Sequence, residues 1–302
     1  MLRACIASGF AVLLSVSSAI AAERETLGWG RIFTNDFLGD NNDRWRTGSN
    51  AISKVTGYGW DGALPDAPGD IIEYRFRSEI IAPDNIVTAA PGDRRYAGAL
   101  SFGMHTHFEK RGVELSMGLD LVITGPQTGI GDFQTEMHKV FGAPTPGVLG
   151  NQIPNGFHPT ALVEAARSYR ISDTITARPY VELQAGAETL VRVGGDLHFG
   201  RLGQDELWVR DVSTGHRYRI NRGEHTGFSA VLGGDIAYVE HSIFLPVYDG
   251  YVLTDTRSRV RAGVHWQGEK SSVFYGLTWL SEEFQAQPES QVVGSVRFHI
   301  RF

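Results

Sequence analysis

Strict alternation of apolar and polar side chains is the strongest pattern along this chain. Between residues 113 and 121, one parity is entirely apolar, and the other carries Glu, Ser, Gly and Asp. The stretches 96–108, 273–279 and 295–302 alternate in a similar way. Successive side chains of a β-strand point to opposite faces, so this period of two predicts strands. The short FEKRG stretch between 96–108 and 113–123 predicts a hairpin.

About a dozen stretches carry this strand pattern. They are 27–38, 45–58, 70–81, 94–108, 112–123, 157–171, 176–186, 190–202, 226–240, 254–267, 271–283 and 290–302. If both termini lie on one side, the connections after odd-numbered strands face the other side. These connections are 39–44, 82–93, 124–156, 187–189, 241–253 and 284–289. Segment 203–225 is then expected to be a long connection on the side of the termini.

Alternation alone fits both a soluble β-sandwich and a transmembrane barrel. In the sandwich the apolar side chains of each strand face a core, and in the barrel they face the lipid. The strand number is even, the only cysteine is Cys5, and the chain ends on Phe302, as bacterial outer-membrane barrels do. These features favour an all-β fold, a transmembrane antiparallel β-barrel of about 12 strands. No later apolar run is long enough for a membrane-spanning helix. We expect residues 23–302 to form this single barrel domain.

Residues 1–22 have the three parts of a secretory signal peptide. Arg3 supplies the positive charge, residues 6–16 the apolar core, and Ala19-Ile20-Ala21 the cleavage site. The exported chain is expected to lack thiols and disulfides, since Cys5 lies in this segment. The formal net charge of −6 comes with no basic stripe, so nucleic acid is not an expected partner.

The longest outer connection, 124–156, contains a predicted short helix. Asp132 is expected to cap its start, and Gly142 followed by Pro144 to end it. Gln134 and His138 lie four apart and share one face. A second face is predicted to be apolar, with Phe133, Met137, Val140 and Phe141. Loops of this length are usually functional or disordered, which makes His138 a candidate base.

Five ordered motifs carry a family resemblance. They are T-N-D-F (34–37), D-R-W-R-T-G (43–48), D-R-R-Y-A-G (93–98), G-P-Q-T-G-x-G-D-x-Q-x-x-x-H-K (125–139) and N-Q-I-x-N (151–155). The resemblance covers most of the mature chain, and the ordered set of motifs is specific although each motif alone is weak. On these motifs the chain resembles the outer-membrane lipid A 3-O-deacylase family.

The resemblance implies a monomeric, Ca²⁺-dependent outer-membrane hydrolase that removes the ester-linked acyl chain at the 3-position of lipid A. By motif, His138 is the general base, Asn35 and Thr47 complete the catalytic group, and Asp36 with Asn35 binds calcium. A base near neutral pKa and a cation that binds an oxyanion suit ester hydrolysis. Because Asn35 and Asp36 are neighbours, a regular strand would point their side chains apart.

Substrate contacts are assigned to Arg94, Arg95 and Gln134. Guanidinium groups grip phosphates well, although rim arginines also meet anionic headgroups without specificity. The loop 82–91 has no Lys or Arg, and His138 is followed by Lys139, which departs from some family members.

Three other interpretations stay open at this stage. If the protein is a non-enzymatic channel or structural barrel, it should conduct in planar bilayers and be unaffected by His138→Ala. An outer-membrane phospholipase uses similar chemistry on another lipid. A soluble periplasmic β-sandwich predicts fractionation without membrane.

Overall fold

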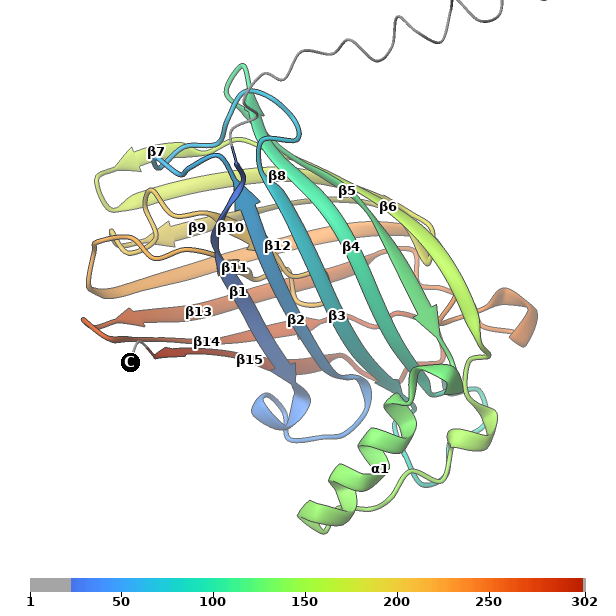
Figure 1. Cartoon of the computed structure of the whole chain (residues 1–302). Coiled ribbons are helices and arrows are strands. Elements are labelled where there is room, and N and C mark those ends of the chain that lie inside the picture. Colours follow the sequence, from blue (N-terminus) through green and yellow to red (C-terminus); the bar gives the residue numbers. More distant parts are fainter. Residues whose placement is uncertain (1–22, 301–302) are drawn as a thin grey trace, which may run out of the picture.

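The computed structural model describes residues 23–300, and within them twelve antiparallel strands close a barrel (Figure 1). The barrel strands are β1 (Glu25–Asn35), β2 (Trp45–Gly57), β3 (Ile72–Ala82), β4 (Ala97–Lys110), β5 (Val113–Thr124), β6 (Gly156–Ala166), β8 (Ile175–Ala185), β9 (Glu188–Phe199), β12 (Gly227–Ser242), β13 (Arg257–Gln267), β14 (Ser271–Leu280) and β15 (Gln291–Ile300). Pairing of β1 with β15 and of β6 with β8 completes the ring. The predicted barrel is confirmed, whereas the signal peptide and Phe302 lie outside the described residues.

The two parities of each strand have opposite environments, as β8 illustrates. Arg178, Tyr180 and Glu182 are buried in the lumen, whereas Val181 and Leu183 are 44% and 50% exposed on the outer wall. Glu182 lies opposite Arg192 of β9 and accepts a hydrogen bond from its Nε at 3.1 Å. The alternation of the sequence therefore sorts apolar side chains to the lipid and paired charges to the interior. In residues 23–300, no helix is long and apolar enough to cross a membrane.

Several predicted strand boundaries are wrong by about three residues, such as the ends at 202 and 283 and the starts at 94 and 254. Two others are wrong because a different element begins there. The first strand ends at Asn35, not at residue 38, because a 3-10 turn, η2 (Asp36–Leu38), begins there. The sixth ends at Ala166, and β7 (Tyr169–Ser172) follows as a separate strand paired with β8. The remaining 3-10 turns are η3 (Pro126–Thr128), η4 (Leu149–Asn151) and η5 (Val247–Asp249).

The predicted loop helix is present as α1 (Ile130–Phe141), at the outer end of the barrel (Figure 1). Its N-cap is Gly129 in the left-handed conformation, so the prediction that Asp132 caps the helix is wrong. Because η3 ends at Thr128, the helix begins three residues earlier than expected, and Asp132 lies in the first helical turn, where its charge interacts favourably with the helix dipole. Gly142, with φ 69°, ends the helix as predicted.

The segment 200–226 is not an extended connection but a plug inside the barrel. It carries the hairpin β10 (Trp208–Arg210) and β11 (Arg217–Arg219). Apolar side chains of the plug pack against inward-facing residues of β1, β2 and β14; the shared cluster includes Leu207, Val209, Tyr218 and Ile220 of the plug with Ile32, Ala51, Val55 and Phe274 of the wall. The lumen at this end is therefore filled with protein.

Candidate active site

The outer end of β1 places two adjacent polar side chains differently. Asn35 caps η2, because its Oδ1 accepts from the Phe37 N–H at 2.9 Å and its Nδ2 donates to the Thr47 carbonyl at 3.0 Å. Asp36 is 1% exposed and accepts hydrogen bonds from the Phe37 and Arg44 backbone N–H groups, each at 2.9 Å. Asn35 thus shapes the turn that holds the Asp36 carboxylate inward.

Two carboxylates converge on one hydroxyl at this turn. Thr47 Oγ1 lies 3.1 Å from Asp36 Oδ1 and 2.6 Å from Asp43 Oδ1, and its single proton serves one of them at a time. Burial, and then the neighbouring Asp43 charge, raises the pKa of Asp36 to about 8, against hydrogen bonds that lower it. The carboxylates of Asp36 and Asp43 therefore need a proton or a positively charged partner.

His138 reaches this pair from α1. Its Nδ1 lies 2.6 Å from the Pro144 carbonyl oxygen, and its Nε2 lies 3.2 Å from Asp43 Oδ2. A carbonyl oxygen only accepts, so Nδ1 carries the hydrogen and Nε2 of the neutral ring presents its lone pair. The helix and the turn after it thus set the tautomer that a general base requires, with Nε2 facing Asp43.

Two buried polar atoms beside these groups have no partner. Gln134 is 4% exposed, and its Nε2 lies 3.4 Å from both Asp43 Oδ1 and His138 Nε2, while its Oε1 is unpaired. The Tyr96 hydroxyl is also buried and unpaired, and burial followed by Asp43 and Asp132 raises the pKa of this phenol. Unpaired buried polar atoms are costly, which points to a group that completes the site.

The oxygen atoms here fit a hard cation such as calcium. No cluster of three or more His, Cys, Asp or Glu suited to a metal occurs within residues 23–300. Asp36 and Asp43 instead supply two carboxylates, and Thr47 and the unpaired Gln134 Oε1 supply neutral oxygens. Calcium accepts such mixed oxygen sets. The Asn35 side chain, predicted as a ligand, is occupied by its two backbone hydrogen bonds.

The two arginines predicted to bind substrate are already engaged. Arg94 is 0% exposed and donates to Glu283 Oε2 at 2.7 Å inside the barrel, so its guanidinium group is not presented at the rim for the predicted contact with substrate. Arg95 donates to Asp249 Oδ1 at 2.9 Å and is partly exposed. Glu283 lies 189 residues from Arg94 in the sequence, so no local pattern indicates this pair.

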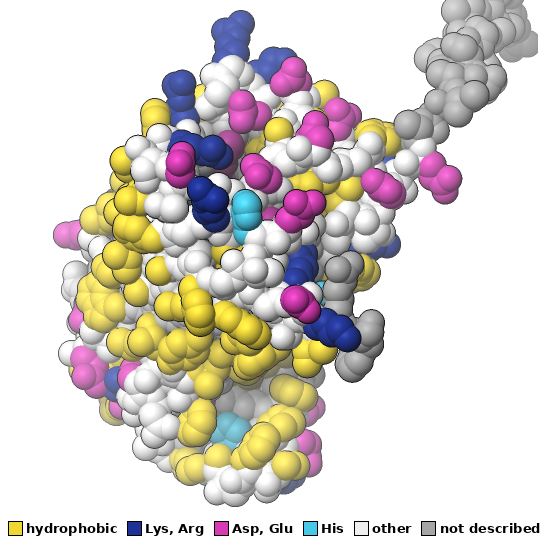
Figure 2. Space-filling view, turned by 90° about the vertical axis from the view of Figure 1, so that its left-hand side faces the viewer, with side chains coloured by type: hydrophobic (Ala, Val, Ile, Leu, Met, Phe, Trp, Pro, Cys, Tyr) yellow, Lys and Arg dark blue, Asp and Glu magenta, His cyan; other side chains and the backbone are white. Residues whose placement is uncertain are grey.

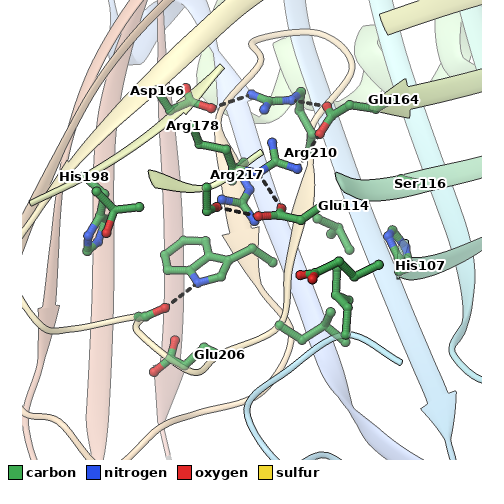
Figure 3. Close-up of a pocket in the computed structure, with 18 of the residues that line it drawn as sticks. His107, Glu114, Ser116, Glu164, Arg178, Asp196, His198, Glu206, Arg210 and Arg217 are labelled. Atoms are coloured by element: carbon green, nitrogen blue, oxygen red, sulfur yellow. Dashed lines mark hydrogen bonds and ion pairs between the residues drawn. The ribbon is translucent and has the colours of Figure 1, made fainter. Parts of the chain in front are cut away.

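A cavity of about 440 Å³ lies elsewhere, between the plug and the barrel wall (Figure 3). Arg178, Arg210 and Arg217 line it together with acids such as Glu114 and Glu164. Arg178 and Arg210 both pair with Glu164, at 2.8 and 2.5 Å. None of its lining residues belongs to the His138 site.

Of the predicted residues, the structure therefore brings Asp36, Thr47, Gln134 and His138 together, with Asn35 behind them. The structure adds Asp43, which was expected near this rim but without an assigned role, and Tyr96, which the prediction missed. Each belongs to a motif quoted above, D-R-W-R-T-G or D-R-R-Y-A-G, and that was the available signal.

A family model described as Outer membrane protein LpxR matches residues 8–302. The chain belongs to the LpxR family. The resemblance drawn from the motifs is thereby confirmed, and a barrel of this family belongs in the outer membrane.

A solved structure of an LpxR protein shares this fold. LpxR from Salmonella typhimurium has a TM-score of 0.75 to this chain at 16% identity, over 91% of this chain and 100% of that one. The KdgM porin in complex with disordered oligogalacturonate (TM-score 0.38, 5% identity, 90% of this chain and 99% of that one) and the beta domain of the Bordetella autotransporter BrkA (TM-score 0.40, 11% identity, 92% and 99%) are more distant. No curated protein matches the chain in sequence.

Proposed function

We propose that this LpxR-family protein hydrolyses the ester that links the 3-position acyl chain to lipid A, with calcium as cofactor. The observation that carries the proposal is the geometry of His138. Its Nδ1 is bound to the Pro144 carbonyl, which leaves Nε2 as the lone-pair donor 3.2 Å from Asp43, at the outer rim of a membrane barrel. A base held in one tautomer on a helix suits attack by water on an ester.

The reaction divides into two proton transfers. His138 Nε2 takes a proton from water as the water oxygen bonds to the acyl carbonyl carbon. Cleavage of the ester C–O bond then returns that proton to the sugar oxygen, which releases a fatty acid and an alcohol. The Asp43 carboxylate faces the imidazolium formed in between and stabilises its charge.

Asp36, Asp43, Thr47 and Gln134 would hold the calcium ion. When bound, it supplies positive charge for the oxyanion that develops on the carbonyl oxygen. The Thr47 hydroxyl lies within hydrogen-bonding distance of both the Asp36 and the Asp43 carboxylates. The backbone N–H groups of Phe37 and Arg44 hold the Asp36 carboxylate in place. Asn35 acts behind them by shaping η2.

The plug argues against the channel alternative. Leu207, Val209 and Tyr218 fill the lumen against the wall, and Arg210 and Arg219 of the plug are paired with Glu164 and Glu206. These packed and paired side chains occupy the lumen where porins have a wide water-filled channel, which favours the enzyme over the channel.

The test is mass spectrometry of lipid A from cells that express wild type, His138→Ala or Lys139→Ala, with and without a calcium chelator. We expect loss of one hydroxyacyl chain with wild type and Lys139→Ala only, and only without chelator. Lys139 is the neighbouring exposed residue, so its variant controls for changes in α1. Unchanged lipid A with folded wild type in the outer membrane would refute the proposal, and lysophospholipid release in that case would indicate a phospholipase.

A further inference from the structure

Helix α1 has three faces, and one of them is apolar and uncovered. Gly131 and Gln134 are buried toward the barrel, and Asp132, Glu136 and Lys139 form a charged face. The third face is exposed and carries Phe133 (59%), Val140 (73%) and Phe141 (77%). This arrangement is typical of a helix that lies in a membrane interface rather than of one surrounded by water.

A further exposed ring lies across the candidate site. Phe37 of η2 is 71% exposed and directly follows the buried Asp36, just as Phe133 directly precedes the buried Gln134. We call Phe37, Phe133, Val140 and Phe141 the apolar rim. Members of the apolar rim are thus adjacent in the sequence to site residues on both η2 and α1.

The apolar rim continues the surface that faces lipid. Phe33 near the outer end of β1 and Phe157 at the outer end of β6 are 46% and 63% exposed on the barrel wall. In Figure 1, α1 projects away from the barrel rim next to η2. Figure 2 shows a broad hydrophobic area across the molecule, further hydrophobic side chains at its lower end, and a hollow containing a His between them.

The charges of the outer loops do not offer an alternative grip on lipid. The outer connections contain Arg44, Arg94, Arg95 and Lys139, and each of them is ion-paired with an acid of the protein. Among these described cations only Lys139 is more than half exposed, and its pair with Glu136 is a surface pair. Contact with the hydrocarbon part of the lipid thus remains the best-supported means of engagement.

We propose that the apolar rim inserts into the acyl-chain layer of the outer leaflet and seats the His138 site at the level of the ester it cleaves. The role of the insertion, which is to seat the His138 site at the ester, rests on the proposed function. The insertion of the apolar rim into lipid does not depend on that function. The occupant is the hydrocarbon of membrane lipid, continuous with the lipid around the barrel wall.

Spin labels on single cysteines test insertion without any reference to activity. The sequence has no cysteine after Cys5, so mature protein refolded into phospholipid vesicles takes a label only at an introduced position. Phe141→Cys is compared with Glu136→Cys, on the charged face of the same helix, and with Leu119→Cys, on the lipid face of β5. We expect oxygen accessibility at 141 to match that at 119, and water-soluble nickel accessibility to be high only at 136.

Nickel accessibility at 141 equal to that at 136 would overturn the proposal. Spin–spin broadening at 141 would overturn it too, because it would mean that a second copy of the chain covers the apolar rim. Either result stands even if lipid A proves not to be the substrate.

The functional arm compares Phe133→Ser/Phe141→Ser with Tyr248→Ser, an equally exposed ring on η5. We expect the double variant to lose about tenfold or more of its deacylation rate on lipid A in vesicles, but to keep its rate within about threefold on detergent-dispersed lipid A. Tyr248→Ser keeps both rates. Equal losses in vesicles and detergent would contradict a seating role and indicate damage to the site.

Discussion

At the scale of single residues, Asp36 makes the site sensitive to pH. Burial raises the pKa of Asp36 to about 8 in the folded chain, well above the ordinary value of an aspartate, so the folded chain holds this proton more tightly than the unfolded chain. The stabilisation from this proton is complete below about pH 4 and is lost as pH rises toward 8. Without calcium, we expect thermal stability of wild type to fall across this window, by up to about 1.4 kcal/mol per pH unit.

Asp36→Asn removes this dependence. The variant should unfold at the same temperature at pH 5 and pH 8 in chelator, as measured by the shift in electrophoretic mobility that accompanies barrel unfolding. It should also lose the stabilisation that calcium gives wild type at pH 8. Asp132→Asn, an exposed carboxylate on α1, serves as the control and should behave as wild type. A wild type whose apo stability rises from pH 5 to pH 8 would contradict the assignment.

Single residues also show which parts of the site could be predicted from the sequence and which could not. Asp36, Thr47 and His138 were identified by motif, and the structure brings them within reach of one another. Asp43 was expected near the rim but was assigned no role, because it lies in an aperiodic loop and contacts His138 only through the fold. Arg94 was misplaced for the same reason, since a buried pair with a distant Glu283 leaves no local pattern.

At the scale of elements, the end of α1 controls the base. Gly142 adopts φ 69°, a conformation that costs other L-residues about 1 kcal/mol or more. His138 lies in the last turn, and its Nδ1 partner, Pro144, follows that cap. We expect Gly142→Ala to loosen this turn and lower lipid A deacylation about tenfold while the barrel folds normally.

Gly150→Ala is the matched control for this variant. Gly150 lies in the same loop, a Cβ there meets nothing within 4 Å, and its φ is outside the left-handed region. Mass spectrometry of lipid A and the heat-dependent mobility shift should show activity and folding unchanged. Full activity of Gly142→Ala would mean that the cap does not position His138.

Elements with a regular period were the most predictable. The strands were found because lipid and lumen impose opposite chemistry on alternate residues. The apolar face of the loop helix was also read from its period, but not its exposure: periodicity identifies a face and does not say whether protein or lipid covers it. The start of α1 was missed because η3 and Gly129 lack side-chain capping signals.

At the scale of the whole molecule, the sequence predicted a closed barrel but not the plug inside it. Segment 203–225 has no extended alternation, so it was read as a connection. Its apolar side chains find partners only after the barrel has closed, since Tyr218 and Ile220 pack against residues of β1, β2 and β14 that are far apart in the chain. Such non-local packing is invisible to local patterns.

The plug leads to the last prediction, which concerns permeability. Wild type in planar bilayers should show no steady conductance, because the hairpin β10–β11 packs into the lumen and its Arg210 is paired with Glu164 and Asp196 of the wall. Replacing residues 207–220 with a short Gly-Ser linker should open a pore. It should also lower thermal stability, because Glu164 loses Arg210 and part of its charge compensation in a low-dielectric interior. Steady conductance by wild type would show that the plug leaves a continuous path, and a closed deletion variant would assign the seal to the charged side chains of the wall instead.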